Sequence, residues 1–154
     1  MSEPALEVTV LGGRDPRRSR CHTIRHTVFI EEQSVPESIE VDGRDASCTH
    51  FLATVAGVDV GTARMRLIDS DGRRVAKAER VAVLAAYRAH GVGRALMDAL
   101  EAAARTMGAV EVRLGAQITA SRFYRRLDYR PLGPRYHEAG IEHQMMRKPL
   151  CRVD

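Results

Sequence analysis

Aromatic side chains are scarce in this sequence. Its 154 residues include three Phe, four Tyr and no Trp. Proteins that bind single-stranded nucleic acid stack the bases on aromatic side chains, and the basic residues here are spread along the chain. The net charge of +4 suits a nucleotide or another anionic ligand. We therefore predict no nucleic-acid partner, while a module that binds nucleic acid through its arginines stays a weakly supported alternative.

Cysteine is also rare. Cys21, Cys48 and Cys151 are odd in number and widely spaced, and no CxxC pair occurs. This pattern argues against both a zinc site and a disulfide framework, so we predict reduced thiols and no bound metal.

Long apolar runs are missing as well. No run approaches the roughly 18 residues that a membrane-spanning helix needs. The first ten residues, MSEPALEVTV, lack the basic region and apolar stretch of a secretory signal. Hydrophobic residues make up 44% and charged residues 29%, which is typical of a soluble globular protein. We predict a cytoplasmic protein with no membrane partner.

Periodic patterns divide the chain into strands and helices. Cys21, Ile24 and Val28 recur at helical spacing after Pro16, which can open a helix, and Gly57 marks a hairpin turn. Gly108 follows an amphipathic helix as its cap. We expect strands at 6–11, 49–55, 58–68, 75–84, 109–116 and 141–148; helices at 17–32, 92–107 and 119–127; and a long loop at 34–47. This order predicts an α/β (α+β) fold in a single domain over residues 1–154, with a mixed sheet and at least one parallel βαβ unit.

The stretch YRAHGVGR, Tyr87–Arg94, lies between a predicted strand and a predicted helix. Backbone N–H groups at a helix N-terminus point outward and attract anions. Gly91 and Gly93 allow close approach of an anion, and Arg88 and Arg94 can add charged hydrogen bonds. The stretch therefore has the properties of a phosphate-binding loop, although an ordinary glycine-containing turn explains the same residues equally well.

Two motifs together carry a family resemblance. The segment ERVAVLAAYRAHGVGRALMDALEAAA, residues 79–104, resembles the acetyl-coenzyme A motif of the GNAT superfamily of N-acetyltransferases, whose signature is Arg/Gln-x-x-Gly-x-Gly/Ala. The segment AQITASRFYRRLDY, residues 116–129, resembles the second half of the same fold. Gln117 stands where the family usually has Asn, and Asp128 where it often has Gly. The resemblance implies a mixed, mostly antiparallel central sheet with a parallel, splayed strand pair, flanked by helices.

The resemblance also implies a cofactor, acetyl-coenzyme A (acetyl-CoA), and residues that bind it. The backbone around Val81 and Val83 would pair with the pantetheine arm between the strands at 76–83 and 110–116, and the amides of 88–94 would hold the pyrophosphate. Tyr124 would protonate the departing thiolate as general acid, although helix-to-core packing is the alternative role for this side chain. The cofactor-binding residues are therefore Val81, Ala82, Val83, Arg88, Ala89, His90, Gly91, Val92, Gly93, Arg94, Gln117, Ser121 and Tyr124.

An acidic segment precedes these motifs. The string RHTVFIEEQSVPESIEVDGRDASCTHF, residues 25–51, and the later AGIEHQMM resemble the ElaA-type subgroup of small GNAT proteins. A second resemblance, to acyl-homoserine-lactone synthases, which share the GNAT architecture, rests on the string Arg25-x-x-x-Phe29, then Glu40-x-Asp42-x-x-Asp45, then Arg64 on a strand. Acidic groups would attract a cationic amine, so we predict substrate-binding roles for Glu40, Asp42, Asp45 and His50. Arg25 and Arg64 more plausibly brace these carboxylates than take part in chemistry.

An amine must lose a proton before it attacks a thioester, so the reaction needs a general base. Glu79 alternates with Val81 and Val83 along one strand, His143 lies on the last strand, and Glu32 lies at a helix end. The sequence leaves all three open as catalytic bases, because spacing alone does not establish geometry.

Three functions remain in competition. The leading prediction is an acyltransferase that moves the acetyl group of acetyl-CoA directly to the amine of a small molecule, and the family resemblance is compatible with a homodimer. The alternatives are an acyl-homoserine-lactone synthase and a non-enzymatic module that binds coenzyme A. No cysteine lies at a motif position that would suggest a covalent acyl-enzyme.

Overall fold

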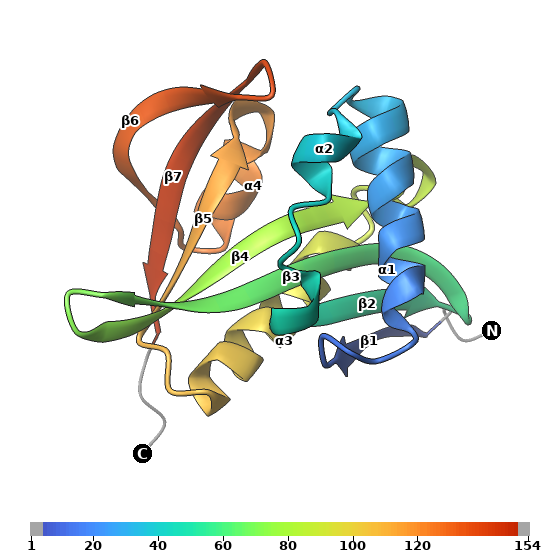
Figure 1. The fold of residues 1–154 in the computed structure, drawn as a ribbon, viewed down its shortest axis with the longest axis horizontal. Helices are drawn as coiled ribbons and strands as arrows, with labels where there is room; N and C mark the ends of the chain where they lie inside the picture. Colours follow the sequence, from blue (N-terminus) through green and yellow to red (C-terminus); the bar gives the residue numbers. More distant parts are fainter. Residues whose placement is uncertain (1–4, 151–154) are drawn as a thin grey trace. The chain divides into compact units, whose positions relative to one another are not determined.

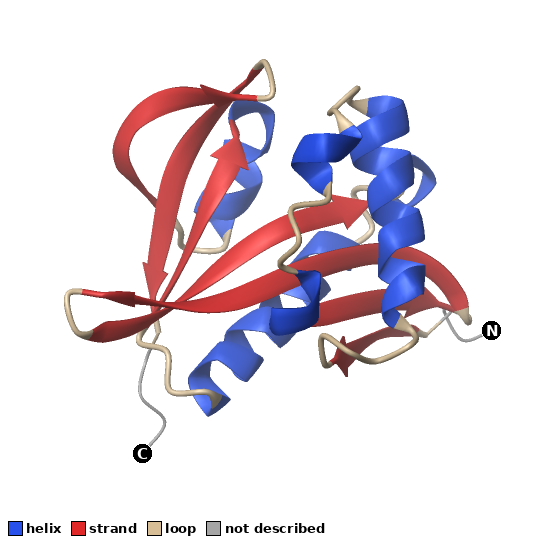
Figure 2. Ribbon diagram, in the orientation of Figure 1, coloured by secondary structure: helices blue, strands red, loops and turns tan. Residues whose placement is uncertain are grey.

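The computed structural model describes residues 5–150 (Figure 1). Seven strands form one sheet in the order β1-β2-β3-β4-β5-β7-β6, accompanied by four α-helices within the described residues (Figure 2). The pair β4–β5 is parallel, whereas β1–β2, β2–β3, β5–β7 and β6–β7 are antiparallel. The predicted mixed, mostly antiparallel fold is confirmed.

The chain divides into two compact units. The first comprises Met1–Met65 and Arg80–Leu100, and the second comprises Arg66–Glu79 and Glu101–Asp154. The prediction of one domain over residues 1–154 stays a prediction, and each unit is described by itself below. No helix within residues 5–150 has the length and hydropathy of a membrane span.

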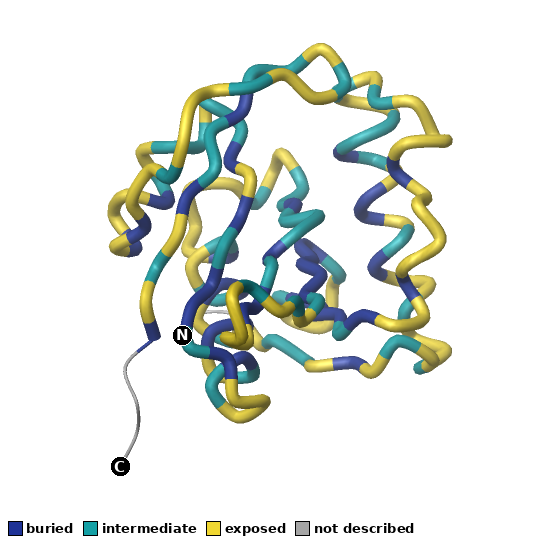
Figure 3. The backbone as a smooth tube through the Cα atoms, turned by 60° about the vertical axis from the view of Figure 1, so that its left-hand side comes forward, coloured by how far each residue is buried: buried dark blue, intermediate teal, exposed yellow. Residues whose placement is uncertain are grey.

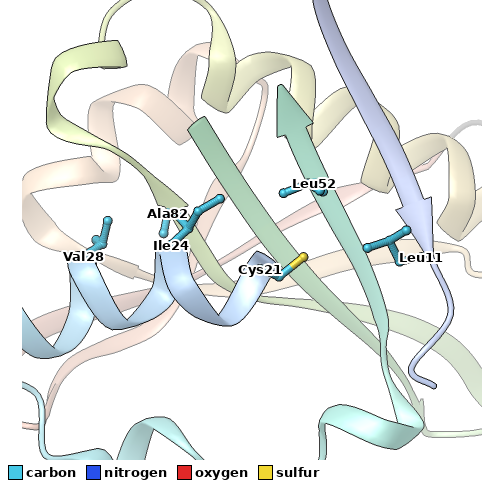
Figure 4. Close-up of a cluster of buried hydrophobic side chains, with 6 residues drawn as sticks. All are labelled: Leu11, Cys21, Ile24, Val28, Leu52 and Ala82. Atoms are coloured by element: carbon cyan, nitrogen blue, oxygen red, sulfur yellow. The ribbon is translucent and has the colours of Figure 1, made fainter. Parts of the chain in front are cut away.

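In the first unit, helix α1 (Arg18–Arg25) packs beside strands β1 (Leu6–Leu11) and β2 (Thr49–Val55), and strand β3 (Val58–Ser70) pairs with β2. The apolar face of α1 carries Cys21 and Ile24, and the third residue of the predicted helical spacing, Val28, lies on the π-helix η1 (His26–Glu32) that follows. Figure 4 shows these side chains beside those of the strands, in a buried cluster made of Leu11, Cys21, Ile24, Val28, Leu52 and Ala82. Burial of this apolar surface stabilises the helix against the strands.

Helix α3 (Val92–Thr106) begins on the other face of β3. A Cβ atom on Gly61 would lie 2.8 Å from Val92 Cγ1 and 3.1 Å from Leu96 Cδ1. The next residue, Thr62, points the opposite way and donates a hydrogen bond to Phe51 O at 2.8 Å. The absence of a side chain at Gly61 therefore lets the start of α3 lie directly on the strand.

In the second unit, the first part of β4 (Arg73–Val83) pairs in parallel with β5 (Glu111–Gln117), from Val75–Glu111 to Ala78–Leu114. The pairing follows the β4–α3–β5 connection and confirms the predicted βαβ unit. Strand β7 (Ile141–Pro149) pairs with β5, and helix α4 (Ser121–Arg126) packs against β5 after the short turn η4 (Ile118–Ala120). Turns between strands are mostly exposed, whereas the strands carry buried positions (Figure 3).

The structure corrects the sequence prediction at three places. The helix predicted at 17–32 is α-helical only to Arg25 and continues as a π-helix, η1 (His26–Glu32). The loop predicted at 34–47 contains helix α2 (Glu37–Glu40) and a 3₁₀ turn, η2 (Asp45–Ser47). Strand β6 (Arg130–Glu138) was not predicted, and Pro131, Gly133 and Pro134 weaken its strand pattern. As an edge strand it tolerates proline, and its pairing with β7 shifts register between Pro131 and Arg135.

Candidate functional site

The predicted phosphate loop joins β4 to α3 in the first unit. After Val83 the chain makes a 3₁₀ turn, η3 (Ala85–Tyr87), and two residues then have left-handed backbones, Ala89 with φ +64° and Gly91 with φ +82°. The first α3 hydrogen bond runs from Ala95 N to Gly91 O at 3.0 Å. The N–H groups of the preceding residues therefore have no acceptor within the helix, which is the geometry of an anion site.

Arg88 connects this loop to the end of η1. Its Nε donates to Val83 O at 2.9 Å, and its terminal nitrogens lie 2.7 and 2.9 Å from the two carboxylate oxygens of Glu32. The hydrogen bond from Arg88 lowers the pKa of Glu32. About two fifths of each side chain remains exposed, 44% for Arg88 and 39% for Glu32. A predicted cofactor ligand and a predicted base therefore hold each other in an accessible ion pair.

The acidic segment forms a buried network around two arginines. Arg25 donates from Nε and Nη2 to Glu40, with distances of 2.9–3.2 Å to its carboxylate oxygens, and from Nη1 to Asp45 Oδ1 at 2.7 Å. Arg64 makes two parallel hydrogen bonds to Asp42, at 2.8 and 2.9 Å, and a third to Asp45 at 3.0 Å. Both guanidinium groups are 1% exposed. The prediction that Arg25 and Arg64 brace the carboxylates is confirmed.

The pKa values of the two aspartates reflect this bracing. Hydrogen bonds from Arg64 hold the pKa of Asp42 well below its usual range. Burial of Asp45 opposes its ionised form, but hydrogen bonds from Arg25 and Arg64 outweigh that penalty and lower its pKa to about 2. Both groups are therefore carboxylates at neutral pH.

Arg80 is a third cation of the network, and it was not among the residues predicted from the sequence. Arg80 Nε donates to Glu40 Oε2 at 2.7 Å, and Nη2 donates to the backbone oxygens of Glu40 and Ile39 at 3.1 and 3.2 Å. Its backbone is left-handed, with φ +54°, which is uncommon for a non-glycine residue and interrupts the regular alternation of β4. No local pattern indicates such a residue in a strand. Three arginines thus face three carboxylates, and the charges of the network balance.

His50 lies under the same network and is fully buried. Its Nε2 is 2.8 Å from Asp45 O, a carbonyl that can only accept, so Nε2 carries the proton. Burial lowers the pKa of His50 and keeps the ring neutral. Nδ1 has no hydrogen-bond partner among the described residues.

In the second unit, Tyr124 combines a buried ring with an unpaired hydroxyl. The residue is 7% exposed, and its ring contacts Phe123 and Tyr129 edge to face, with centroids 4.9 and 5.8 Å apart. Within residues 5–150 its hydroxyl makes no hydrogen bond. Burial raises the pKa of Tyr124, so the group is a neutral proton donor at physiological pH. The packing and acid roles left open by the sequence are both compatible with this geometry.

Tyr129, on which Tyr124 packs, is anchored at its far end. Its hydroxyl donates to Glu101 Oε2 at 2.8 Å, and Lys148 Nζ donates to Glu101 Oε1 at 2.8 Å. Tyr129 is fully buried, and its backbone N–H donates to Tyr124 O at 3.0 Å. Tyr129 stands where the GNAT family often has Phe, but the sequence does not indicate that its hydroxyl contacts Glu101.

Two further predicted cofactor residues frame the turn between β5 and α4. Gln117 ends β5 and is paired in register with His143 on β7. Ser121 begins α4, and its hydroxyl donates to Ile118 O at 2.8 Å, which stabilises the η4 turn. Their roles toward a cofactor stay predictions.

Glu79 and His143, the other two candidate bases, have contrasting surroundings. Glu79 Oε1 accepts a hydrogen bond from Arg66 Nε at 2.9 Å and lies 3.6 Å from Lys77 Nζ. His143 Nδ1 lies 2.7 Å from Ile141 O, so Nδ1 carries the proton and Nε2 presents its lone pair. Nε2 has no hydrogen-bond partner in the described part of the chain. Of the three candidates, His143 is the one without a cationic partner there.

No group of three or more His, Cys, Asp or Glu side chains between residues 5 and 150 is placed to hold a metal. Cys21 and Cys48 are both buried, and burial raises the pKa of the Cys21 thiol. Cys151 lies outside the described residues.

Comparison with known proteins identifies the class. Residues 15–150 match the family model described as an acetyltransferase (GNAT) domain. The N-acetyltransferase YjcF of Bacillus subtilis (strain 168), itself uncharacterised, is 38% identical over 126 residues, which cover 81% of this chain and 87% of YjcF. These matches define the protein as an acyltransferase and disfavour the non-enzymatic alternative. The chain belongs to the GNAT acetyltransferase family.

Solved structures agree with this assignment. A crystal structure from Lactobacillus plantarum superposes with a TM-score of 0.85 at 28% identity, over 96% of this chain and 99% of that one. Escherichia coli ElaA superposes with a TM-score of 0.76 at 28% identity, over 94% of this chain and all of ElaA (100%). The resemblance to the GNAT family and to ElaA that the motifs indicated is confirmed.

Proposed function

We propose that the protein transfers the acetyl group of acetyl-CoA directly to the amine of a small molecule. The observation that carries the proposal is the loop between β4 and α3. Its left-handed Ala89 and Gly91, the N-terminal amides of α3 and the accessible guanidinium of Arg88 suit a pyrophosphate. GNAT acetyltransferases generally use acetyl-CoA, and this chain is a member of that family.

The donor supplies an acetyl group activated as a thioester, together with a thiolate leaving group. In our proposal the amides of residues 88–94 bind the pyrophosphate, and the backbone of Val81 and Val83 binds the pantetheine arm. The backbone N–H near Val83 stabilises the negative charge that develops on the carbonyl oxygen. Ala82, whose side chain is buried in the α1 cluster, holds this part of β4 in place.

We assign the general base to His143. The carbonyl of Ile141 fixes the tautomer, so Nε2 can accept the proton that the attacking amine loses. Glu79 and Glu32 each accept a hydrogen bond from an arginine, and the one from Arg88 lowers the pKa of Glu32 and weakens it as a base. Tyr124 then gives its hydroxyl proton to the departing thiolate, and solvent restores it.

Glu40, Asp42 and Asp45 remain our proposed substrate-binding residues, with His50 beneath them, but their charges are balanced by Arg25, Arg64 and Arg80. In our proposal they therefore contribute to recognition through the shape of the α2 region and not through a net negative potential. We also retain the homodimer and the cytoplasmic location as proposals.

A panel of amines incubated with acetyl-CoA tests the proposal, with free thiol as the readout. We expect thiol release above the hydrolysis background with at least one small amine, and an acetylated product of matching mass. Two results would contradict amine transfer. Thiol could be released at the same rate with and without every amine, or the protein could bind acetyl-CoA and release no thiol at all. Lactone formed from S-adenosylmethionine and an acyl carrier would instead support the synthase alternative.

The Glu32–Arg88 pair gives a separate prediction about cofactor affinity. Replacing Glu32 with Gln removes the charge that competes with pyrophosphate for Arg88, so the Kd for acetyl-CoA should fall about two- to fivefold, as expected for an exposed ion pair. Glu31→Gln is the matched control, because Glu31 is exposed and lies near His26 instead. Pantetheine, which lacks phosphate, should bind both variants like the wild type. An unchanged Kd in Glu32→Gln would show that the pair does not compete with the cofactor.

A further inference from the structure

Tyr136 is the aromatic residue that contacts the proposed base. It lies on β6 directly opposite His143 on β7, and the two rings stack with centroids 5.5 Å apart and an interplanar angle of 21°. Neither strand β6 nor a role for Tyr136 was predicted from the sequence. The stack covers one face of the imidazole, while the hydrogen bond to Ile141 O holds one edge of it.

The far end of Tyr136 is also fixed. Its hydroxyl lies 3.5 Å from Met145 Sδ, and a Cβ atom on Gly115 of β5 would lie 2.2 Å from the hydroxyl oxygen. Gly115 and Met145 are themselves paired in register. The tyrosine therefore reaches across β7 to the backbone of β5, and a side chain at Gly115 would displace it.

We infer that Tyr136 is a positioning residue for His143. Together with Ile141 O it restrains the imidazole so that Nε2 remains directed away from both contacts and free to take the proton of the amine. Gly115 provides the space that this arrangement needs. The inference rests on the proposed function, and on His143 as the base in particular.

Position matters because proton transfer requires hydrogen-bond distance between base and substrate. A displacement of about 1 Å can lower a rate on the order of 100-fold. A ring free to rotate on β7 would spend only part of its time in the productive orientation. Loss of the stack should therefore lower kcat while leaving the affinity for the cofactor unchanged.

Kinetics of four variants test the inference. Tyr136→Ala should lower kcat at least about tenfold, with the KM for acetyl-CoA unchanged. Tyr136→Phe keeps the stack and should retain most activity, whereas Gly115→Ala should resemble Tyr136→Ala. His137→Ala is the control, since His137 is an exposed neighbour on the same strand. In a His143→Ala background, Tyr136→Ala should cause no further decrease in kcat. An additional decrease in that background, or full activity of the single variant Tyr136→Ala, would overturn the inference.

A readout that does not depend on turnover separates this inference from the proposed function. Nuclear magnetic resonance of the imidazole nitrogens, assigned with His143→Gln, should show the Nδ1–H tautomer of His143 in the wild type. Tyr136→Ala should show a mixture of tautomers, because a ring released from the stack can rotate away from Ile141 O, the acceptor that fixes the tautomer. The same tautomer in both proteins would overturn the positioning role even if the enzyme is active. If the tautomer of His143 changes in Tyr136→Ala as predicted but the protein acetylates no amine, the positioning role of Tyr136 stands. That result would count against the proposed function alone.

Discussion

Replacing Tyr124 with Phe is expected to lower kcat by about 10²–10⁴-fold, the range that a general acid typically contributes. The substitution removes a hydroxyl that makes no hydrogen bond within the described residues, so the packing of the ring against Phe123 and Tyr129 should persist. Burial raises the pKa of Tyr124, which keeps the proton in place until the thiolate leaves. The Kd for acetyl-CoA should stay within about twofold of wild type if the hydroxyl acts only after binding.

Tyr129→Phe provides the matched control for this experiment. It removes a hydroxyl from the neighbouring ring, but this hydroxyl donates to buried Glu101 rather than standing unpaired. We expect a loss of about 1–3 kcal/mol in unfolding free energy, because an oxygen of Glu101 loses its donor, with kcat near wild type. If Tyr124→Phe lowers stability and leaves kcat unchanged, the ring packs and the acid assignment is wrong.

The second large effect concerns stability. Arg25→Ala should destabilise the protein by about 3–5 kcal/mol, because it leaves Glu40 and Asp45 buried without one of their donors. For a chain of this size that corresponds to a decrease in Tm of about 6–20 °C. Arg17→Ala is the control, since Arg17 is 53% exposed in its pair with Asp15 and should change stability by less than about 1 kcal/mol. Thermal unfolding of both variants measures the difference.

The same network predicts how stability depends on pH. The pKa of Asp45 is about 2 in the fold and has the usual value of 3.8 when the chain is unfolded. A lowered pKa contributes stability that is complete above the unfolded value and is lost as pH falls from about 4 toward 2. Urea unfolding should therefore show a smaller loss on acidification in Arg25→Ala than in wild type. An equal acid dependence in the two proteins would contradict the assignment of the shift to Arg25.

Elements with strong periodicity could be predicted from the sequence. The hairpin around Gly57, the amphipathic α3 and the helix carrying Cys21, Ile24 and Val28 lie where their patterns indicated. Strand β6 could not be predicted, because two prolines and a glycine suppress the strand pattern and only pairing with β7 makes it regular. The change from α-helix to π-helix after Arg25 also has no signal in the local sequence.

The candidate site divides in the same way. The loop at 88–94 could be predicted because the glycines and the following helix are local features. The contacts of Arg80 with Glu40, and of Tyr136 with Gly115, join residues about 40 and 20 positions apart, and nothing local encodes them. Tertiary structure likewise brings Arg88 to Glu32 and Arg66 to Glu79. These contacts distinguish the two carboxylates from His143, the third candidate base.

Calorimetric titration with acetyl-CoA tests the central claim most directly. The account predicts saturable binding at one site per chain, with affinity that falls when Arg88 is replaced by Ala and that is retained in Tyr124→Phe. Absence of binding at millimolar acetyl-CoA would contradict the proposed donor, and with it the roles assigned to the loop at 88–94.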